Sequence, residues 1–295
     1  MKLQSAMEYL MTYGWAILII AVVLAALFEL GIFNPNAFAP KAAPGGCKVV
    51  KEVNPGAISF ASLEGACTGQ LPQYVAQFVA STSNVLAPAS VSYALSRTNS
   101  FSEFAWIYPK SVTNAYPTII SMAQAQLGLY NNAGTTYVVR PCISSGCWTA
   151  DARTINAGQW SMVGFTYDHA LGVLTVYING IGGTPQSTSA SVPGTNTMCI
   201  GSNLDTAVYG DMCTHEWGFQ GDIVNVQIYN ASLSANDIAS LYNEGIGGVP
   251  KDINYLVGWW PLNGDAKDYS GNGNDGIASA ISYTGSWASS YAGPS

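Results

Sequence analysis

The chain has 295 residues, of which 48% are hydrophobic and only 9% charged, and its formal net charge is -7. Its ten Lys and Arg residues are scattered, which argues against nucleic-acid binding, because phosphate contacts need clustered basic side chains. Abundant Gly, Ser, Thr, Asn and aromatic residues are typical of a β-rich extracellular protein. Apart from an N-terminal apolar segment, this length suits one large all-β domain.

The first 33 residues are predicted to form a hydrophobic helix. No charged residue lies between Glu8 and Glu29, and a helix of about 20 apolar residues can cross the ~30 Å hydrocarbon core of a membrane. The leader before Gln4 is shorter than an ordinary secretory signal, and no small-residue cleavage site precedes the domain. We therefore expect the helix to stay on the mature protein, in the membrane or in the core of a filament.

Residues 4–16 resemble the class III signal of archaeal type IV pilin-like proteins, through Gln4, the glutamate four positions later and the apolar run. The resemblance implies cleavage between Leu3 and Gln4, although the family has a small residue in place of Leu3. It also implies that Glu8 pairs with the free amino group of a neighbouring copy, because an unpaired carboxylate in hydrocarbon is costly. Alternatively, Glu8 and Glu29 only mark two membrane interfaces.

Residues 34–46 are rich in Pro, Ala, Gly and Asn and are predicted to be an extended linker, because Pro and Gly interrupt helices. Residues 47–295 are predicted to form the folded domain. Its first part contains short apolar runs, such as 74–79 and 91–95, whose length and aromatic content favour strands.

A hairpin and a further strand are predicted in the middle of the chain. At 172–180, Leu174, Val176 and Ile178 share one face, and Asn179-Gly180 is a strong hairpin signal. At 223–228, alternation divides the strand into two faces. The residues expected to point inward are Val224, Val226 and Ile228, and those expected outward are Asn225 and Gln227.

One short helix is predicted after this strand. Ser234 is placed to cap it, with Asp237 three residues on, and Gly245 is placed to end it. Ile238, Leu241 and Tyr242 form its apolar face. Together these elements describe a sandwich with one small surface helix.

Four segments resemble, in order, the laminin G-like, concanavalin A-like jelly-roll family: 101–109, 158–168, 173–180 and 221–242. The resemblance covers roughly residues 90 to 285. It implies a mainly β fold, an antiparallel jelly-roll β-sandwich preceded by one long hydrophobic N-terminal α-helix.

The resemblance also implies an unusual chain order. In the family, a strand like 256–262 and a turn like 268–276 open the domain, whereas here they close the chain. We therefore expect a circular permutation in which strands within 253–285 complete the sandwich. The alternative is the truncated start of a second copy, but about forty residues are too few for an independent core.

Six cysteines occur as three pairs of sequence neighbours: Cys47 and Cys67, Cys142 and Cys147, and Cys199 and Cys213. An even number of cysteines in a chain that starts with an export-type segment indicates disulfides in an oxidising compartment. Sequence alone leaves the pairing open, and we expect the local one. A zinc site is the alternative, but the chain has no CxxC and only two histidines.

The loop at 268–276 is the best candidate for a cofactor site. Calcium takes oxygen ligands from Asp, Asn and backbone carbonyls on tight turns, and the jelly-roll resemblance implies calcium there. The candidate ligands are Asp222, Asp268, Asn272, Asn274 and Asp275. The alternative is a turn that needs only left-handed backbone conformers.

No catalytic set is evident. Glycoside hydrolysis needs two carboxylates about 5 to 9.5 Å apart, and the best candidate acid is Glu216 beside His215. Neither a serine-nucleophile motif nor a metalloprotease motif occurs. We therefore expect a protein that is not an enzyme.

Aromatic rings could bind extracellular glycans by stacking on sugars. The candidates are Trp217, Tyr209, Trp148 and Trp287, whereas Trp106, Trp160 and Trp259 are expected in the core. Asn230-Ala231-Ser232 is a glycosylation sequon, or alternatively part of the approach to the capped helix.

These features together predict a pilin-like subunit of an archaeal cell-surface filament that displays an adhesive domain. Its expected partners are copies of itself through the N-terminal helix, the membrane and extracellular glycans. The alternatives are a non-polymerising, membrane-anchored surface lectin and a surface glycoside hydrolase.

Overall fold

The computed structural model describes residues 2–29, 39–52, 60–79, 82–110, 114–122, 124–132, 134–144, 146–147, 152–189, 191, 194, 196–205, 212–214 and 217–294. The chain divides into two compact units, residues 1–39 and residues 40–295.

The first unit contains the helix α1 (Lys2–Glu29). Its large apolar side chains between Met11 and Leu24 are exposed, including Trp15 and Ile17, each at 66%. Within the described part of the chain, no helix combines the length and the apolar character that a membrane span requires. The structure describes the backbone of Leu3, Gln4 and Glu8, to which the sequence assigns processing and assembly, but not their side chains.

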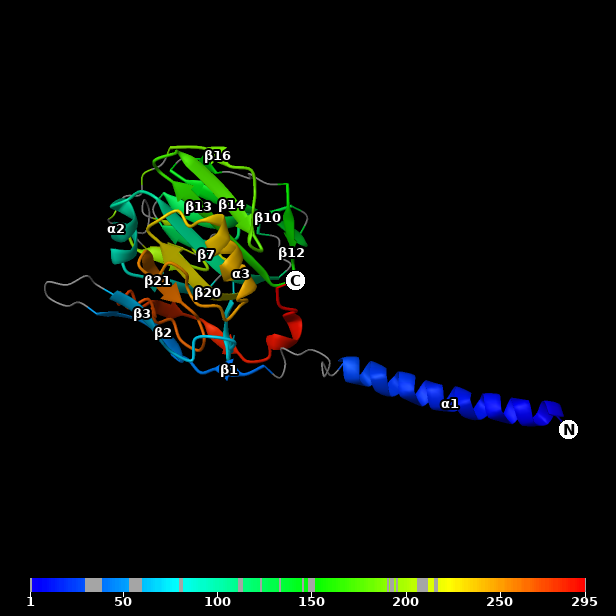
Figure 1. Ribbon diagram of the computed structural model, residues 1–295. Helices are drawn as coiled ribbons and strands as arrows, with labels where there is room; N and C mark the ends of the chain where they lie inside the picture. Colours follow the sequence, from blue (N-terminus) through cyan, green and yellow to red (C-terminus); the bar gives the residue numbers. More distant parts are fainter. Residues whose placement is uncertain are drawn as a thin grey trace. The chain divides into compact units, whose positions relative to one another are not determined.

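The second unit is a sandwich of two antiparallel sheets, and we call the first of them the covered sheet (Figure 1). Its strands in spatial order are β15 (Ile181–Gly182), β14 (Val173–Ile178), β13 (Ser161–Asp168), β7 (Phe101–Pro109), β20 (Gly221–Tyr229), β5 (Val75–Phe78) and β23 (Ser282–Thr284), with β16 (Gln186–Ser187) beside β14 and β21 (Leu256–Trp260) beside β20.

We call the second sheet the open sheet. Its strands in spatial order are β11 (Gly146–Cys147), β10 (Thr136–Ile143), β9 (Ala125–Asn131), β8 (Thr118–Met122), β17 (Met198–Ile200), β6 (Asn84–Ala87) and β22 (Ile277–Ser279), with β12 (Thr154–Asn156) beside β10. Three small pairs complete the strands: β1 (Lys41–Ala42) with β4 (Leu71–Pro72), β2 (Cys47–Glu52) with β3 (Phe60–Gly65), and β18 (Asn203–Asp205) with β19 (Met212–Thr214).

The main core lies between the two sheets, where Phe101, Phe165 and Val226 of the covered sheet and Ile120 and Leu127 of the open sheet are buried in one cluster. A second cluster lies on the other face of the covered sheet. There α3 (Ala235–Asn243) and the segment around η2 (Ala288–Ser290) pack on the sheet (Figure 1). The covered sheet is therefore buried on both faces, and every residue of β20 is buried.

Two local predictions are confirmed. Leu174, Val176 and Ile178 of β14 all face the main core, and Asn179 and Gly180 turn into β15 with positive φ angles of 50° and 78°, as an Asn-Gly hairpin turn requires. At α3, the Ser234 side chain accepts a hydrogen bond from the Asp237 backbone N–H.

Two other local predictions are wrong. Residues 91–95 lie in a helix, α2 (Ser90–Ser96), because Val91, Ser92 and Leu95 are buried at helical spacing. Asn225 and Gln227 do not point outward into solvent, since both are buried. The register of β20 shifts between Val224 and Gln227, so Val224 packs in the cluster under α3 while Val226 faces the main core.

The segment predicted as a linker, residues 34–46, belongs in its second half to the folded domain. Residues 34–38 lie outside the described residues, but the second compact unit begins at Pro40. Leu71 N–H donates to the Pro40 carbonyl and Asn263 Nδ2 donates to the Ala42 carbonyl. These bonds fix the segment to the sandwich although its composition is that of a linker.

The C-terminal strands belong to both sheets. β21 pairs with β20, β22 pairs with β6, and β23 pairs with β5. Strands within 253–285 thus complete the sandwich, and the circular permutation inferred from them stays a prediction.

Candidate functional site

The outer face of the open sheet is the candidate site, because the outer face of the other sheet is covered. β10 alternates strictly between half-buried and buried positions. Val139 and Ile143 belong to the main core, so Val138, Arg140 and Cys142 line the outer face. On β9 the register places Gln126 opposite Cys142 and Tyr130 opposite Val138, on this same face.

A row of paired residues crosses this face between two disulfides. Cys147 pairs with Cys142, Cys142 with Gln126, Gln126 with Ser121, and Ser121 with Cys199. The bonds Cys142–Cys147 and Cys199–Cys213 therefore lie at the two ends of the row. With Cys47–Cys67, these are the local pairings expected from the sequence.

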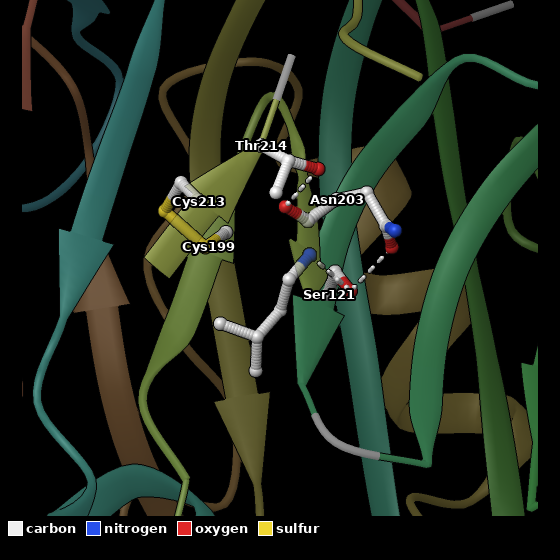
Figure 2. The surroundings of a disulfide bond; sticks show 6 residues. Ser121, Cys199, Asn203, Cys213 and Thr214 are labelled. Atoms are coloured by element: carbon white, nitrogen blue, oxygen red, sulfur yellow. Dashed lines mark hydrogen bonds between the residues drawn. A yellow bond between two sulfur atoms is a disulfide. The ribbon is translucent and has the colours of Figure 1, made fainter. Parts of the chain in front are cut away.

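The second of these disulfides fixes a short hairpin against the sheet (Figure 2). Cys213 lies on β19 and ties the β18–β19 pair to Cys199 on β17. Ser121 Oγ donates to Asn203 Oδ1 at 3.2 Å and accepts from the Leu204 backbone N–H at 3.1 Å. This hairpin consequently forms a fixed wall beside β8.

A polar pocket of about 320 Å³ lies at this wall. Ser121, Gln126, Asn203 and Leu204 contribute to its lining, together with Cys142. The remaining lining residues are Met122, Gln124, Ala125, Ser144 and Asn196. Its described lining contains no carboxylate and no cationic side chain, so its polar groups are neutral amides and hydroxyls that can both donate and accept hydrogen bonds.

An aromatic cluster lies on the same face. The Tyr116 ring lies 5.7 Å from the Tyr130 ring and 6.2 Å from the Trp217 ring, measured between centroids. Each of these three side chains is 37–38% exposed. The Arg140 guanidinium carbon lies 4.9 Å from the centroid of the Tyr116 ring, so the cluster combines exposed rings with one cation.

The cluster and the pocket follow one another along the strands. Tyr130 and Gln126 are four residues apart on one face of β9, which corresponds to roughly 13 Å. Arg140 stands two residues from Cys142 on the same face of β10. The outer face therefore offers rings, a guanidinium and a polar pocket in sequence.

The predicted calcium loop is instead filled by internal hydrogen bonds. The Asp268 carboxylate accepts four of them, from the backbone N–H groups of Trp259, Ser270 and Asn274 and from Ser270 Oγ. Asp275 Oδ1 accepts from the Asp268 N–H. These oxygens are already used in holding the turn.

A cationic side chain also reaches this loop. Lys51 Nζ donates to Asn272 Oδ1 at 2.8 Å, and Asn274 Oδ1 accepts from Ser90 Oγ. The described residues contain no group of three His, Cys, Asp or Glu side chains arranged to hold a metal. As arranged, the loop fits a hydrogen-bonded turn rather than a calcium site, and calcium binding stays a prediction.

Asp222 is not brought to this loop. It pairs with Gln77 and Tyr108 near the start of β20, whereas Gln227 pairs with Trp259 beside Asp268. The five-residue separation along β20 corresponds to roughly 16 Å. Burial raises the pKa of Asp222, against the opposing effects of Lys110 and Gln77.

The other candidate residues have different outcomes. Trp217 is in the aromatic cluster, but Trp287 is only 3% exposed and packs in the cluster under α3. Trp106 and Trp259 are buried as expected, and Trp160 is partly buried. Tyr209, Trp148, His215 and Glu216 lie outside the described residues.

The glycosylation sequon is partly shielded. Asn230 is half-buried, and its Oδ1 is buried without a hydrogen-bond partner among the described residues. The helix cap is made by Ser234 instead. Glycosylation at Asn230 stays a prediction.

One buried acid stands apart from all these sites. Glu103 of β7 is fully buried, and neither carboxylate oxygen has a hydrogen-bond partner in the described part of the chain. Its neighbours two residues away, Phe101 and Ala105, face the main core, which places Glu103 between the sheets. Burial raises its pKa to about 8.

Comparison with known structures identifies similar folds. A candidate carbohydrate-binding protein from Bacteroides ovatus matches with a TM-score of 0.56 and 16% identity, over 79% of this chain and 65% of that one. This chain thus spans less than two thirds of that protein's length. A native heptameric SAP-like pentraxin from Limulus polyphemus matches with a TM-score of 0.47 and 13% identity, over 80% of this chain and 93% of that one. At these identities the likeness is one of fold alone.

A family model matches more than half of the chain. No curated protein sequence matches this chain, but the Laminin_G_3 family model matches its residues 80–239. These residues run from just before β6 into α3 and include β7, β13, β14 and β20. The chain therefore belongs to this laminin G-type family of the concanavalin A-like lectin/glucanases superfamily.

Proposed function

We propose that this protein binds extracellular glycans through the outer face of its open sheet and displays that face at the cell surface. The observation that carries the proposal is the succession, on this face, of exposed rings and a polar pocket, of which the pocket lies between two disulfides. Rings stack on the apolar faces of sugars, and amides and hydroxyls bond to sugar hydroxyls. The similar Bacteroides ovatus protein is itself named as a candidate carbohydrate-binding protein.

Binding without hydrolysis is the form of this function that the site favours. Glycoside hydrolysis needs a pair of carboxylates facing the scissile bond, and the described lining of the pocket has none. Glu103 is enclosed between the sheets and cannot reach this face. We therefore propose an adhesive or lectin-like role, and a hydrolysis assay on any bound oligosaccharide would reveal an enzyme by its reducing-end products.

Glycan binding can be tested on the full-length protein in detergent with an immobilised glycan panel. The test variant is Trp217→Ala, which removes one ring of the cluster, and the matched control is Tyr255→Ala, an aromatic that is 52% exposed beside the covered sheet. We expect about five- to tenfold weaker binding for Trp217→Ala, since ring stacking contributes roughly 1–1.5 kcal/mol. Equal binding by all three proteins, or none by the wild type, would overturn the proposal.

The N-terminal helix supplies a second part of the proposal, which is tethering or assembly. Apolar side chains are exposed all around the described part of α1, and a helix that is apolar all round needs lipid or other helices around it. We propose that α1 is a pilin-like assembly element or a membrane anchor and that prepilin-type cleavage before Gln4 makes Glu8 a pairing residue. The three disulfides support a location outside the cytoplasm.

Two measurements distinguish a filament subunit from a simple membrane anchor. Mass spectrometry of the mature N-terminus is expected to find Gln4 as the first residue. Electron microscopy of cell-surface preparations is expected to show filaments that Glu8→Leu abolishes while the protein stays in the membrane fraction. Filaments that survive Glu8→Leu would refute the pairing role, and a membrane protein without filaments would support the anchored lectin.

A further inference from the structure

We infer that the outer face of the open sheet selects acidic glycans, through a contact between Arg140 and an anionic group on the sugar. This inference rests on the proposed glycan-binding function and specifies its ligand class. It starts from the position of Arg140, which stands on β10 between the aromatic cluster and the polar pocket.

The guanidinium of Arg140 is held in place, and no carboxylate among the described residues neutralises it. It lies over the Tyr116 ring, with 4.9 Å between the guanidinium carbon and the ring centroid. The described part of the chain gives it no ion pair, since the salt bridges there join Lys48 to Glu64 and Lys251 to Glu244. A planar guanidinium stacked on a ring keeps its N–H edge available for a carboxylate or sulfate.

The surroundings of Arg140 make this charge distinctive. The chain carries a net charge of -7 with only ten Lys and Arg residues, so a general attraction for anions is not expected. The described lining of the adjoining pocket has neutral polar groups and no positively or negatively charged side chain. An acidic sugar would therefore be recognised by one local, directional contact rather than by a basic surface.

The preorganisation of the face supports the same conclusion. Cys142, two residues along β10, is bonded to Cys147, and Gln126 on the neighbouring strand donates to Thr118 Oγ1 at 2.6 Å. Both sides of the strip next to Arg140 are consequently fixed. A sugar stacked on Tyr116 or Trp217 would carry its substituents past the guanidinium toward the pocket.

The test uses pairs of oligosaccharides that differ in one kind of anionic group. Suitable probes are trigalacturonate against its methyl ester, sialyllactose against its methyl ester, and sulfated against unsulfated lactose. With the full-length wild type we expect the acidic member of at least one pair to bind about tenfold tighter, because hydrogen bonds to a charged group are stronger than those between neutral groups. Which pair responds distinguishes carboxylate from sulfate as the anionic group.

Two variants connect the preference to this side chain. Arg140→Gln is expected to bring the ratio of acidic to neutral affinity down to about one, and Arg140→Lys is expected to restore only part of that ratio, since an ammonium cannot form the bidentate contact. Matched melting temperatures for both variants would show that folding is unchanged. A preference that persists in Arg140→Gln would overturn the inference.

The outcomes keep the inference and the proposed function apart. Equal binding of acidic and neutral probes by the wild type, lost in Trp217→Ala, would refute the acidic preference and keep the glycan-binding face. Failure of every probe and of the wider glycan panel would refute both. An acidic preference that falls with added salt in the wild type and is absent in Arg140→Gln would support both.

Discussion

The two sheets of the sandwich differ in what lies on their outer faces. The covered sheet has α3 and the η2 segment packed on it, and β20 is buried along its whole length. The open sheet presents half-buried polar residues, exposed rings and a pocket of about 320 Å³. The difference separates two tasks, because one sheet can be optimised for stability while the other stays available to a ligand.

Polar side chains are nevertheless buried in the covered sheet, and they differ in whether they have hydrogen-bond partners. Asn225 is fully bonded: its Nδ2 donates to the Ile246 and Gly248 carbonyls, and its Oδ1 accepts from Gln227 Nε2 and Trp259 Nε1. Glu103 has no such partner among the residues that the structure describes. Changes at these residues should therefore affect stability and leave glycan binding intact, whereas changes on the open sheet should do the reverse.

The largest expected effect is that of Asn225→Ala. The variant leaves four buried groups without partners and places alanine at a φ of 55°. We expect the free energy of unfolding to fall by about 3–4 kcal/mol, measured by urea denaturation with the disulfides intact. The control Asn236→Ala, at an exposed position of α3, should change it by less than about 0.5 kcal/mol.

A second effect of similar size is the dependence of stability on pH that Glu103 produces. Its pKa is about 8 in the folded protein against an ordinary value of 4.5. The stabilisation is therefore complete below about pH 4.5 and is lost as the pH rises through about 8, because the folded state holds the proton that the unfolded chain releases. The slope reaches at most about 1.4 kcal/mol per pH unit.

Urea denaturation at several pH values would isolate this contribution. Glu103→Gln keeps the side-chain shape and is expected to remove the slope, whereas Glu64→Gln, at an exposed carboxylate, should keep it. A wild type whose stability is constant over this range would show that Glu103 finds a partner or water in solution.

A smaller loss of stability is expected for Asp268→Asn. The substitution replaces one of two accepting oxygens with an NH₂ group that faces N–H donors. We expect a loss of about 2 kcal/mol, with Asp252→Asn, at an exposed aspartate, as the control.

The same loop tests the calcium prediction. Asp268 accepts four hydrogen bonds and Lys51 Nζ donates to Asn272, so a loop that is only a hydrogen-bonded turn should give the same melting temperature in calcium and in EDTA. A rise with calcium that disappears in Asp268→Asn would instead support the calcium interpretation.

The smallest effects on stability are expected on the open sheet. Trp217→Ala and Arg140→Gln alter partly exposed side chains and should change the free energy of unfolding by less than about 1 kcal/mol. If either variant unfolds the protein, its effect on glycan binding would say nothing about the site, and the separation between the two sheets would fail.

The sequence predicts the local parts of this structure well. The Asn179-Gly180 turn and the Ser234 cap depend on adjacent residues, so their signals are complete in a few positions. The short run 91–95 was predicted to be a strand and is a helix, and the helical spacing of its buried residues Val91, Ser92 and Leu95 becomes visible only once the core is known.

The candidate site could not be predicted in the same way. Cys142, Gln126, Ser121 and Cys199 form one row only because four strands pair in a particular register. In β10 the apolar Val138 lies on the outer face and Pro141 is buried, so residue type alone does not show which positions of this strand face outward. The burial of Asn225 likewise depends on a bulge and on the covering by α3.

The pairing of the last strands has a consequence for when the domain can fold. Ser282 Oγ of β23 bonds to Gln77 Oε1 of β5 across 205 residues of sequence, and β22 closes onto β6 over a similar span. Contacts this distant cannot form until the end of the chain has been synthesised. If the chain is exported with its N-terminal helix first, the sandwich must therefore close after translocation, under the conditions in which its disulfides also form.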